Sequence, residues 1–377
     1  MVKKKIVNIV LNNYVNDARV SKTSSSLSRN DHEVEIVAVH ADGLSVSETK
    51  DGVNVTRVKV ITKNLPKTKP VQLLKYFEFL VRVFFRYRNK VDIVHCNDLN
   101  AMPVGYLLKK FSKNKVSIIY DCHEYETERD GMSSFEKRIL KFFERYLIKF
   151  ADSVLTVSDS IARCYSEDYG IDKPKLVLNC PVLTEEKKRD LFRETFGIRP
   201  DQTVFLYQGG LKSGRGIELI LEAFADLESD RNVLVCMGYG PLEAAIQEKA
   251  RKYNTVFFHP AVNQDVLLKY TSSADYGILF YEDTCLNHRY CSPNKIFEYL
   301  MAGLPVLTSN LYEIRRLVEK EGVGIVAEEN TVESFRNAVI ASLEQDYSAI
   351  QANVFNARKK YCWEEQEKVL KEVYDNI

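Results

Sequence analysis

The feature that most constrains this sequence is a run of short β-branched segments alternating with longer amphipathic segments, and the run occurs twice. Short apolar runs bounded by turn residues predict strands, and apolar residues at helical spacing predict helices between them. Many of the expected strands are apolar almost throughout, which is typical of a parallel sheet covered on both faces. We therefore expect an α/β protein of two doubly wound, Rossmann-like domains facing each other across a cleft.

Each series supplies a full set of elements. In the first, strands are expected at residues 5–11, 33–39, 53–60, 92–96, 116–121, 153–157 and 175–179. Helices are expected there near 17–30, 71–88, 99–112, 134–150 and 158–168. In the second, strands are expected at 203–208, 232–237, 255–259, 276–280, 305–309 and 322–327. Helices are expected there near 185–196, 214–228, 241–253, 264–273, 293–302, 311–320 and 331–345.

The two series are expected to meet near Pro181, which disfavours helix in the residue before it. This gives an N-terminal domain over residues 1–181 and a C-terminal domain over residues 182–349. The sign of the charge also changes here, because residues 1–180 carry a net +8 and residues 181–377 a net −7. Residues 350–377 are predicted to form a C-terminal helix that either packs on its own domain or crosses back to the first.

The composition excludes several classes of protein. With 45% hydrophobic and 28% charged residues, the chain is neither collagen-like nor a low-complexity disordered protein. No apolar run approaches the roughly 20 residues of a membrane-spanning helix, and Asn8 interrupts the apolar start, which we interpret as a strand. A net charge of +1 argues against a nucleic-acid partner. The eight cysteines form no C-x-x-C pair and no zinc spacing, so we expect reduced thiols, no metal site and a cytoplasmic protein.

Chemistry in open α/β sheets is expected in the loops that follow strands. One such loop is YQGGLKSGRG at residues 207–216, where a strand ends, two cations lie among glycines and a helix begins. Free backbone N–H groups and the helix dipole favour an anion at such a place. The loop is therefore either a phosphate-binding site or a tight turn with solvated Lys212 and Arg215.

A second segment is YCSPNKIFEYLMAGLPV at residues 290–306. Ser292 is expected to cap a helix with Pro293 in its first turn. Lys295 then opposes the helix dipole, which indicates that an anion is expected there. Glu298, one turn on, is placed to accept hydrogen bonds from sugar or ribose hydroxyls; the alternative is a solvated Lys295–Glu298 pair.

Two places in the first half complete the candidates. His123 in YDCHE follows a buried-type strand, where it is either a ligand-binding residue or a hydrogen-bonded structural one. Asp17 is expected to cap the first helix, and Arg19 is expected to project from its first turn toward an acceptor.

Two segments combine basic and aromatic residues, at 67–90 and 137–150. Helices of this composition lie on anionic membranes or cover a sheet with their apolar face. For residues 67–90 the two interpretations stay open. For residues 137–150 we expect a helix that covers a sheet with its apolar face.

Together these segments resemble glycosyltransferase family 4, the nucleotide-sugar-dependent retaining enzymes of GT-B fold. The resemblance runs through most of the chain in order. Its segments are DARV at 17–20, DIVHCND at 92–98, YDCHE at 120–124, ADSVLTVS at 151–158, GGLKSGRG at 209–216, MGYGP at 237–241, SPNKIFEYLMAG at 292–303 and YCWE at 361–364.

The resemblance implies roles for particular residues. Arg215 and Lys295 are expected to grip the diphosphate and, with His123 at the transferred sugar, to form the catalytic set. The full donor-binding set is Gly209, Gly210, Arg215, Gly238, Gly240, Ala261, Ser292, Asn294, Lys295, Ile296 and Glu298. The acceptor-side set is Asn13, Asp17, Arg19 and Glu124.

The sequence departs from the family pattern at three places. Gly210 replaces the usual second Arg of the diphosphate grip, and Asn12-Asn13 replaces the usual Gly-Gly after the first strand. Tyr290 stands where the family has the first Glu of its E-x7-E motif, which contacts the donor sugar.

The implied function is a metal-independent, retaining glycosyltransferase that uses a nucleoside diphosphate sugar, with a UDP-sugar favoured, and no cofactor. Its acceptor would be a saccharide or a lipid-linked saccharide in surface polysaccharide or glycolipid assembly, at the inner face of the cell membrane with peripheral contact to anionic lipid. Two alternatives stay open: a nucleotide-sugar epimerase of GT-B fold, and a non-catalytic GT-B-like assembly subunit.

Overall fold

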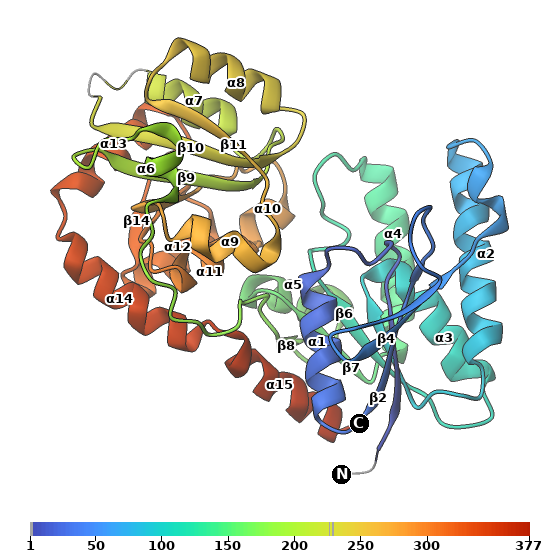
Figure 1. The fold of residues 1–377 in the computed structure, drawn as a ribbon. Helices are drawn as coiled ribbons and strands as arrows, with labels where there is room; N and C mark the ends of the chain where they lie inside the picture. Colours follow the sequence, from blue (N-terminus) through green and yellow to red (C-terminus); the bar gives the residue numbers. More distant parts are fainter. Residues whose placement is uncertain (1–2, 226, 228–229) are drawn as a thin grey trace. The chain divides into compact units, whose positions relative to one another are not determined.

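The computed structural model describes residues 3–225, 227 and 230–377 and divides the chain into two compact units (Figure 1). Unit 1 comprises the residues up to Val177 together with Gln366–Ile377, and unit 2 comprises Leu178–Glu365. The division thus falls a few residues before Pro181, near which the two domains were expected to meet. Each unit is built around one sheet of mostly parallel strands.

Unit 1 has an eight-stranded sheet in the order β3-β4-β2-β1-β5-β6-β7-β8. Its strands are β1 (Lys5–Ile9), β2 (Glu33–Val39), β3 (Ser47–Lys50), β4 (Val53–Val58), β5 (Ile93–Asn97), β6 (Ser117–Cys122), β7 (Ser153–Thr156) and β8 (Lys175–Leu176). Neighbours pair in parallel except β3 and β4, which are antiparallel. The sequence pattern does not predict β3, because its four residues are exposed and show no apolar alternation.

The helices of unit 1 begin where the sequence places capping residues. They are α1 (Ala18–Arg29), α2 (Lys69–Tyr87), α3 (Met102–Phe111), α4 (Ser134–Leu147) and α5 (Asp159–Tyr169), with short 3-10 turns η1 (Ile61–Asn64), η2 (Leu99–Ala101) and η3 (Ile148–Phe150). The side chains of Asp17, Ser133 and Ser158 each accept a hydrogen bond from the backbone N–H three residues on. The capping role expected of Asp17 is therefore confirmed.

The expectation that α4 covers the sheet with its apolar face is wrong. Leu147 is buried and Leu140 half-buried, but the other large apolar residues are exposed: Phe135, Ile139, Phe142, Phe143 and Tyr146. The buried side instead carries Glu144, whose carboxylate accepts hydrogen bonds from three tyrosine hydroxyls, those of Tyr120, Tyr165 and Tyr169. The rotation of α4 is thus set by a buried polar cluster, because a buried carboxylate must keep its partners.

Unit 2 has a six-stranded, all-parallel sheet in the order β11-β10-β9-β12-β13-β14. Its strands are β9 (Thr203–Gly210), β10 (Asn232–Tyr239), β11 (Val256–Pro260), β12 (Tyr276–Leu279), β13 (Val306–Thr308) and β14 (Gly324–Val326). Alternate residues of β9 enter two separate apolar clusters, Val204 and Leu206 in one and Phe205 and Tyr207 in the other. Both faces of the sheet are therefore covered, as the apolar strands predict.

The remaining helices are α6 (Leu191–Phe196), α7 (Ile217–Ala225), α8 (Glu243–Lys252), α9 (Gln264–Thr271), α10 (Leu286–Tyr290), α11 (Asn294–Met301), α12 (Tyr312–Glu321), α13 (Val332–Glu344), α14 (Tyr347–Lys360) and α15 (Trp363–Asp375). The helix α6 begins later than expected; in the segment before it, Lys188 donates to Asp275 and the Arg189 N–H donates to the Ser272 carbonyl. The expected end of α7 includes residues 226 and 228, which lie outside the described residues.

The C-terminal segment forms two helices where one was expected. The backbone of Tyr361 (φ −102°, ψ 57°) ends α14, and α15 begins at Trp363, whose N–H donates to the Pro181 carbonyl at 2.7 Å. The part of α15 from Gln366 onward belongs to unit 1. Across the described parts of the chain, all eight cysteines are free thiols, and no helix combines the length and apolarity needed to cross a membrane.

Candidate functional site

Glycines bring two strand ends of unit 2 into close approach. Gly238 at the end of β10 pairs in register with Gly209 at the end of β9. A Cβ on Gly238 would lie 1.9 Å from the Gly209 carbonyl oxygen, and one on Gly240 would lie 2.3 Å from the Leu211 carbonyl oxygen. Gly209 itself has φ +114°, a conformation that L side chains rarely adopt. Larger residues are therefore excluded from this edge of the sheet.

Lys295 lies against this glycine-rich edge. Its Nζ is 4.1 Å from the ring centroid of Tyr207 and 5.5 Å from that of Tyr281. A Cβ on Gly209 would lie 3.7 Å from the same Nζ, so the ammonium group packs directly over the Gly209 backbone. Lys295 is buried.

Arg215 lies close to Tyr281, one of the two tyrosines that Lys295 faces. Its guanidinium carbon is 4.1 Å from the ring centroid of Tyr281, the ring that Lys295 also faces. Burial, together with the positive charge of Arg215, lowers the pKa of Lys295 to about 7, against the opposing effect of Glu298. The fold thus holds two basic side chains together at a strand edge. Burial of the charged form of Lys295 costs free energy, and an anionic ligand would offset that cost.

Glu298 is oriented by β9. Its Oε2 accepts a hydrogen bond from Gln208 Nε2 at 2.6 Å, and Gln208 Oε1 accepts one from Thr271 Oγ1 at 2.8 Å. The expectation of a solvated Lys295–Glu298 pair is wrong, because Lys295 is buried. Sequence reasoning misses Gln208 and Tyr281; the signal that would find them is their position at the carboxyl ends of strands.

The start of α11 differs from the expected one. Pro293, and not Ser292, is the residue before the first helical position, and no side chain caps the helix within the described structure. Pro293 has an extended backbone (φ −67°, ψ 138°), which places Lys295 in the first turn as predicted. Asn294 is exposed and Ile296 is buried.

Residue 290 is a tyrosine, so no carboxylate stands where the family pattern has the first Glu of its E-x7-E motif. It ends α10 and packs edge-on against the ring of Tyr312, with centroids 6.2 Å apart. Of the acids nearby in sequence, Asp283 is engaged by the Arg289 guanidinium through three hydrogen bonds. The remaining predicted donor residues follow strands, with Gly210 exposed at the end of β9 and Ala261 exposed after β11.

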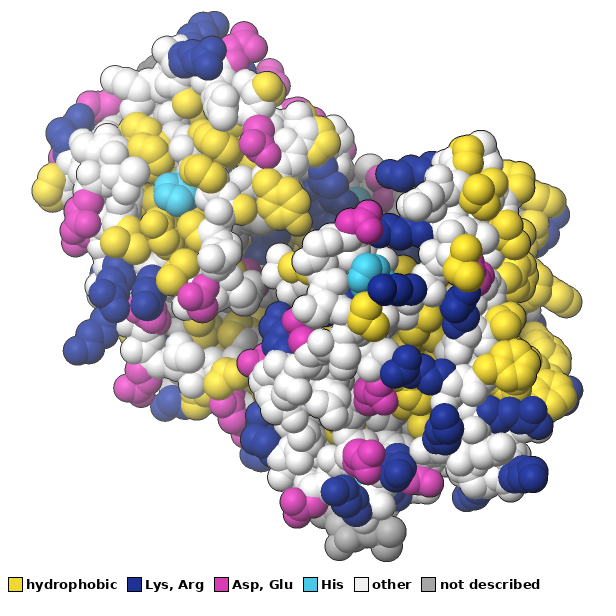
Figure 2. Space-filling model, turned by 45° about the vertical axis from the view of Figure 1, so that its right-hand side comes forward, with side chains coloured by type: hydrophobic (Ala, Val, Ile, Leu, Met, Phe, Trp, Pro, Cys, Tyr) yellow, Lys and Arg dark blue, Asp and Glu magenta, His cyan; other side chains and the backbone are white. Residues whose placement is uncertain are grey.

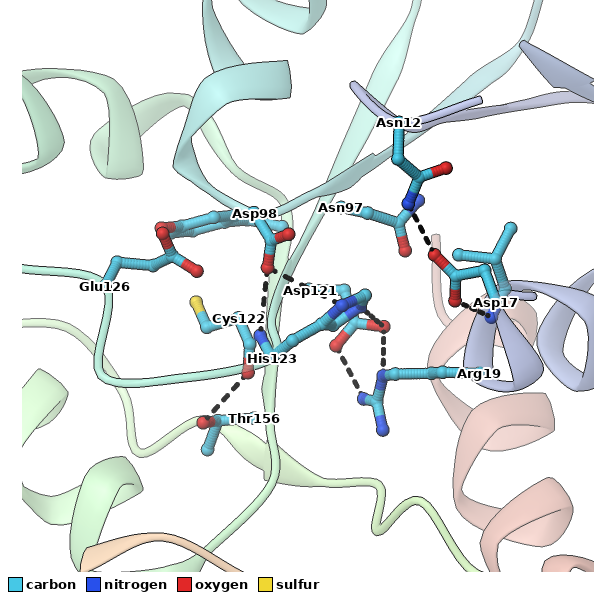
Figure 3. A network of polar contacts seen from close by, with 12 residues as sticks. Asn12, Asp17, Arg19, Asn97, Asp98, Asp121, Cys122, His123, Glu126 and Thr156 are labelled. Carbon is cyan, nitrogen blue, oxygen red and sulfur yellow. Dashed lines mark hydrogen bonds and ion pairs between the residues drawn. The ribbon is translucent and has the colours of Figure 1, made fainter. Parts of the chain in front are cut away.

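A polar network occupies the corresponding edge of unit 1 (Figure 3). Arg19 donates from Nε to Asp121 Oδ2 at 2.9 Å and from Nη2 to Asp121 Oδ1 at 2.6 Å. Its Nη1 donates to the Val177 carbonyl. Arg19 was expected to project toward an acceptor; instead it is 3% exposed, and its guanidinium is bound to Asp121 and to the Val177 carbonyl inside unit 1. Burial alone would raise the pKa of Asp121, but Arg19 holds it well below its usual range.

His123 lies between two carboxylates. Its Nδ1 is 3.5 Å from Asp98 Oδ1 and its Nε2 is 3.4 Å from Asp121 Oδ2. Burial opposes the charged ring, yet the two carboxylates outweigh it and raise the pKa of His123. The side chain keeps 20% of its surface exposed at the carboxyl end of β6, so it is accessible to a ligand.

Residues that sequence reasoning misses surround this histidine. His95 donates from Nε2 to Asp121 Oδ2 at 3.2 Å, because that ionised carboxylate can only accept, and its Nδ1 accepts from the Tyr374 hydroxyl at 2.6 Å. Asp98 adopts a positive φ of 61°, which is rare for a non-glycine residue and often marks a functional site. Buried Glu126 has its pKa raised well above the usual range by burial and by Asp98. The pairing of β5 with β6 brings His95 and Asp98 to this place, and the packing of α15 on unit 1 adds Tyr374.

The other residues predicted for the acceptor side lie near the surface. Asn13 and Glu124 are exposed, and Asp17 is half-buried with its Oδ2 accepting from Asn12 Nδ2 at 2.9 Å. The Asn13 carbonyl accepts a hydrogen bond from Arg57 Nε. Within the described residues, no group of three or more His, Cys, Asp or Glu side chains is arranged to hold a metal ion.

Comparison with known proteins gives the class. Residues 17–181 match the family model described as a glycosyl transferase 4-like domain, and residues 202–345 match the one described as glycosyl transferases group 1. An uncharacterised glycosyltransferase of Methanocaldococcus jannaschii, MJ1607, is 26% identical over 372 residues, or 93% of this chain and 91% of the relative. The chain therefore belongs to the glycosyltransferases of GT-B fold with family 4 and group 1 domains.

Two further relatives extend the comparison. A putative teichuronic acid biosynthesis glycosyltransferase of Bacillus subtilis, TuaH, is 26% identical over 209 residues, or 52% of this chain and 50% of the relative. The crystal structure of Anabaena Alr3699/HepE in complex with UDP and glucose shares the fold, with a TM-score of 0.76 at 15% identity, covering 99% of this chain and 100% of that one.

Proposed function

We propose that this glycosyltransferase moves a sugar from a nucleoside diphosphate sugar to an acceptor hydroxyl, and that Arg215 and Lys295 hold the diphosphate. The observation that supports this best is the pair of cations gathered around Tyr281, with Lys295 directly over the Gly209 backbone. Like charges held together beside the N-terminus of a helix that no described side chain caps favour a ligand that carries several negative charges.

The same cations suit the chemistry of the leaving group. Breaking the bond to the anomeric carbon places negative charge on the diphosphate, and groups that bind this charge as it develops lower the barrier. We propose retention by front-face attack, in which the leaving phosphate oxygen takes the acceptor proton. This route requires neither a protein base nor a metal ion.

His123 and Glu298 receive positioning roles in this proposal. His123, held by Asp98 and Asp121, would contact the transferred sugar, and its raised pKa favours the form that donates from both ring nitrogens. Glu298, oriented by Gln208, would accept hydrogen bonds from the ribose hydroxyls.

We propose UDP as the donor nucleotide and a saccharide or lipid-linked saccharide as the acceptor, in surface polysaccharide or glycolipid assembly. The support for UDP is its presence in the Anabaena structure that shares this fold. The support for the acceptor class is the teichuronic acid assignment of the Bacillus relative.

The test is turnover of a UDP-sugar, followed as donor hydrolysis and as transfer. Arg215→Ala and Lys295→Ala should each lower turnover about 100-fold, the usual loss when one charge-stabilising donor is removed. Lys212→Ala is the matched control, because this exposed lysine of the same loop should leave turnover unchanged. Unchanged turnover in both site variants would sink the diphosphate assignment, and epimerised donor formed without acceptor would favour the epimerase alternative.

A further inference from the structure

Two helices of unit 1 expose apolar stripes that the proposed reaction does not use. On α2 the stripe recurs every four residues and consists of Leu73, Phe77, Val81 and Phe85. On α4 it consists of Phe135, Ile139, Phe142, Phe143 and Tyr146. Residues three and four apart share one side of a helix, so each set forms a continuous strip. Phe85, Phe135 and Phe142 are 68, 69 and 70% exposed.

The exposure of the α4 stripe is imposed by the opposite side of the helix. Glu144 is buried among three tyrosine hydroxyls. In the two turns before it, Lys137 Nζ pairs with Glu128 at 2.8 Å and Lys141 Nζ pairs with Asp168 at 2.7 Å. Rotating α4 to bury its phenylalanines would break these ion pairs and leave the buried Glu144 and the tyrosine hydroxyls without their hydrogen bonds. The aromatic face is therefore held outward by the fold.

The two stripes belong to one surface. The helix α3 lies between α2 and α4, with Phe84 edge-on to Phe111 and Tyr106 edge-on to Tyr146. Lys69 at the start of α2 is 3.7 Å from Glu136 at the start of α4. Figure 2 shows apolar side chains gathered along this part of unit 1, with Lys and Arg among them. We call the surface formed by the exposed stripes of α2 and α4 the aromatic face.

The charges that accompany the aromatic face are mainly positive. The helix α2 carries four Lys or Arg against one Glu, and that Glu78 pairs with Arg82. The helix α4 carries four Lys or Arg, of which Lys137 and Lys141 pair with acids on its opposite side, against two Glu, of which Glu144 is buried. A hollow of about 250 Å³ between α3 and α4 adds two more lysines; its lining is Tyr106, Lys109, Lys110, Tyr146 and Phe150.

We propose that the aromatic face binds the surface of an anionic lipid bilayer. Phenylalanine and leucine side chains would enter the boundary between headgroups and acyl chains, and the surrounding Lys and Arg would meet the lipid phosphates. Charge complementarity favours lipid over a second copy of the chain, because a symmetric dimer through this face would bring two basic surfaces together. The inference goes beyond the transfer reaction, because it concerns the surface on which the enzyme works.

The test is co-sedimentation of the full chain with vesicles. We expect binding to an equal mixture of phosphatidylcholine and phosphatidylglycerol and little binding to phosphatidylcholine alone. Added salt should weaken the binding, because it screens the contribution of the basic residues.

The decisive variant combines Phe77→Ser, Phe85→Ser, Phe142→Ser and Phe143→Ser. It should bind the anionic vesicles at least about tenfold more weakly, because each exposed ring supplies insertion free energy. Its melting temperature should match the wild type, since exposed positions contribute little to stability. Ile340→Ser with Leu343→Ser on α13 of unit 2 is the matched control, because these residues are also exposed and apolar but lie outside the aromatic face.

Three results would overturn the proposal. One is vesicle binding by the four-fold variant that equals the wild type; another is equal binding of the wild type to neutral and anionic vesicles. The third is a wild-type dimer in analytical ultracentrifugation that the variant dissociates, which would make the face a contact between copies. If UDP still raises the melting temperature of the four-fold variant, its nucleotide site is intact. A change in vesicle binding is then separate from a failure of the proposed transfer function.

Discussion

At the scale of single residues, Lys295 carries the most consequential property of the site. It is buried beside Arg215, and burial together with this like charge lowers its pKa to about 7. A lysine in that state is about half protonated near neutral pH and gains its full charge only when an anion arrives. In the proposed diphosphate site, the residue would therefore couple proton binding to ligand binding.

This coupling predicts proton uptake when UDP binds above pH 7. The free site holds Lys295 largely neutral at pH 8, and the diphosphate restores the ordinary, higher pKa, so a proton is taken from the buffer. UDP affinity should accordingly fall as pH rises from about 7, by up to about tenfold per unit. Calorimetry at pH 8 in Tris and in HEPES should give different binding enthalpies. The difference should equal the difference between the ionisation enthalpies of the two buffers, multiplied by the number of protons taken up.

The control for proton uptake is Lys295→Met, which keeps the volume and removes the titrating group. Its enthalpies in the two buffers should agree much more closely than those of the wild type. Equal enthalpies for the wild-type chain at pH 8 would contradict the buried, ligand-linked lysine.

Sequence reasoning identifies individual site residues better than it identifies their partners. Lys295 is placed in the first turn of a helix by Pro293, and His123 at a strand end by the apolar run before it. Asp121 lies two residues before His123 at the end of β6, so local strand geometry places these two side chains on one face. Asp98, in contrast, meets His123 because β5 and β6 pair in one particular register. Register is a tertiary property, so this partner and the burial of Arg19 are not readable from local pattern.

At the scale of elements, the amphipathic pattern predicts that α4 is a helix but not which side faces inward. The pattern favours burial of the phenylalanines, as in most surface helices. The tyrosines that bond Glu144 come from β6 and α5, far away in sequence, and they reverse the orientation. The competing principle is that a buried charge must be paired, and here it outweighs apolar burial.

The buried cluster predicts a large loss of stability in Glu144→Leu. Three tyrosine hydroxyls would lose their acceptor inside the unit, and each unsatisfied buried group costs about 1–3 kcal/mol. We expect the free energy of unfolding to fall by about 3 kcal/mol or more in chemical denaturation. Phe142→Ser on the exposed side of the same helix is the control and should change it by less than about 0.5 kcal/mol. Similar values for the two variants would mean that Glu144 does not set the orientation of α4.

At the scale of the whole molecule, the repeated strand–helix pattern predicts two sheets, and the structure contains two. The sequence also shows that the halves differ in charge, with +8 in residues 1–180 and −7 in residues 181–377. The structure adds where these charges lie: an aromatic face with basic helices in unit 1, and one local pair of cations in the acidic second half. The proposed anion sites are therefore local features, which the net charge of +1 hides.

The central claim is that Arg215 and Lys295 hold a nucleoside diphosphate, and calorimetry with UDP, GDP and ADP tests it most directly. We predict that UDP binds tightest and that Arg215→Ala weakens UDP binding about tenfold or more, since a charge-assisted hydrogen bond contributes about 1.5–3 kcal/mol. Lys212→Ala should bind UDP like the wild type. Absence of nucleotide binding by the wild-type chain, or equal UDP affinity in Arg215→Ala, would contradict the claim.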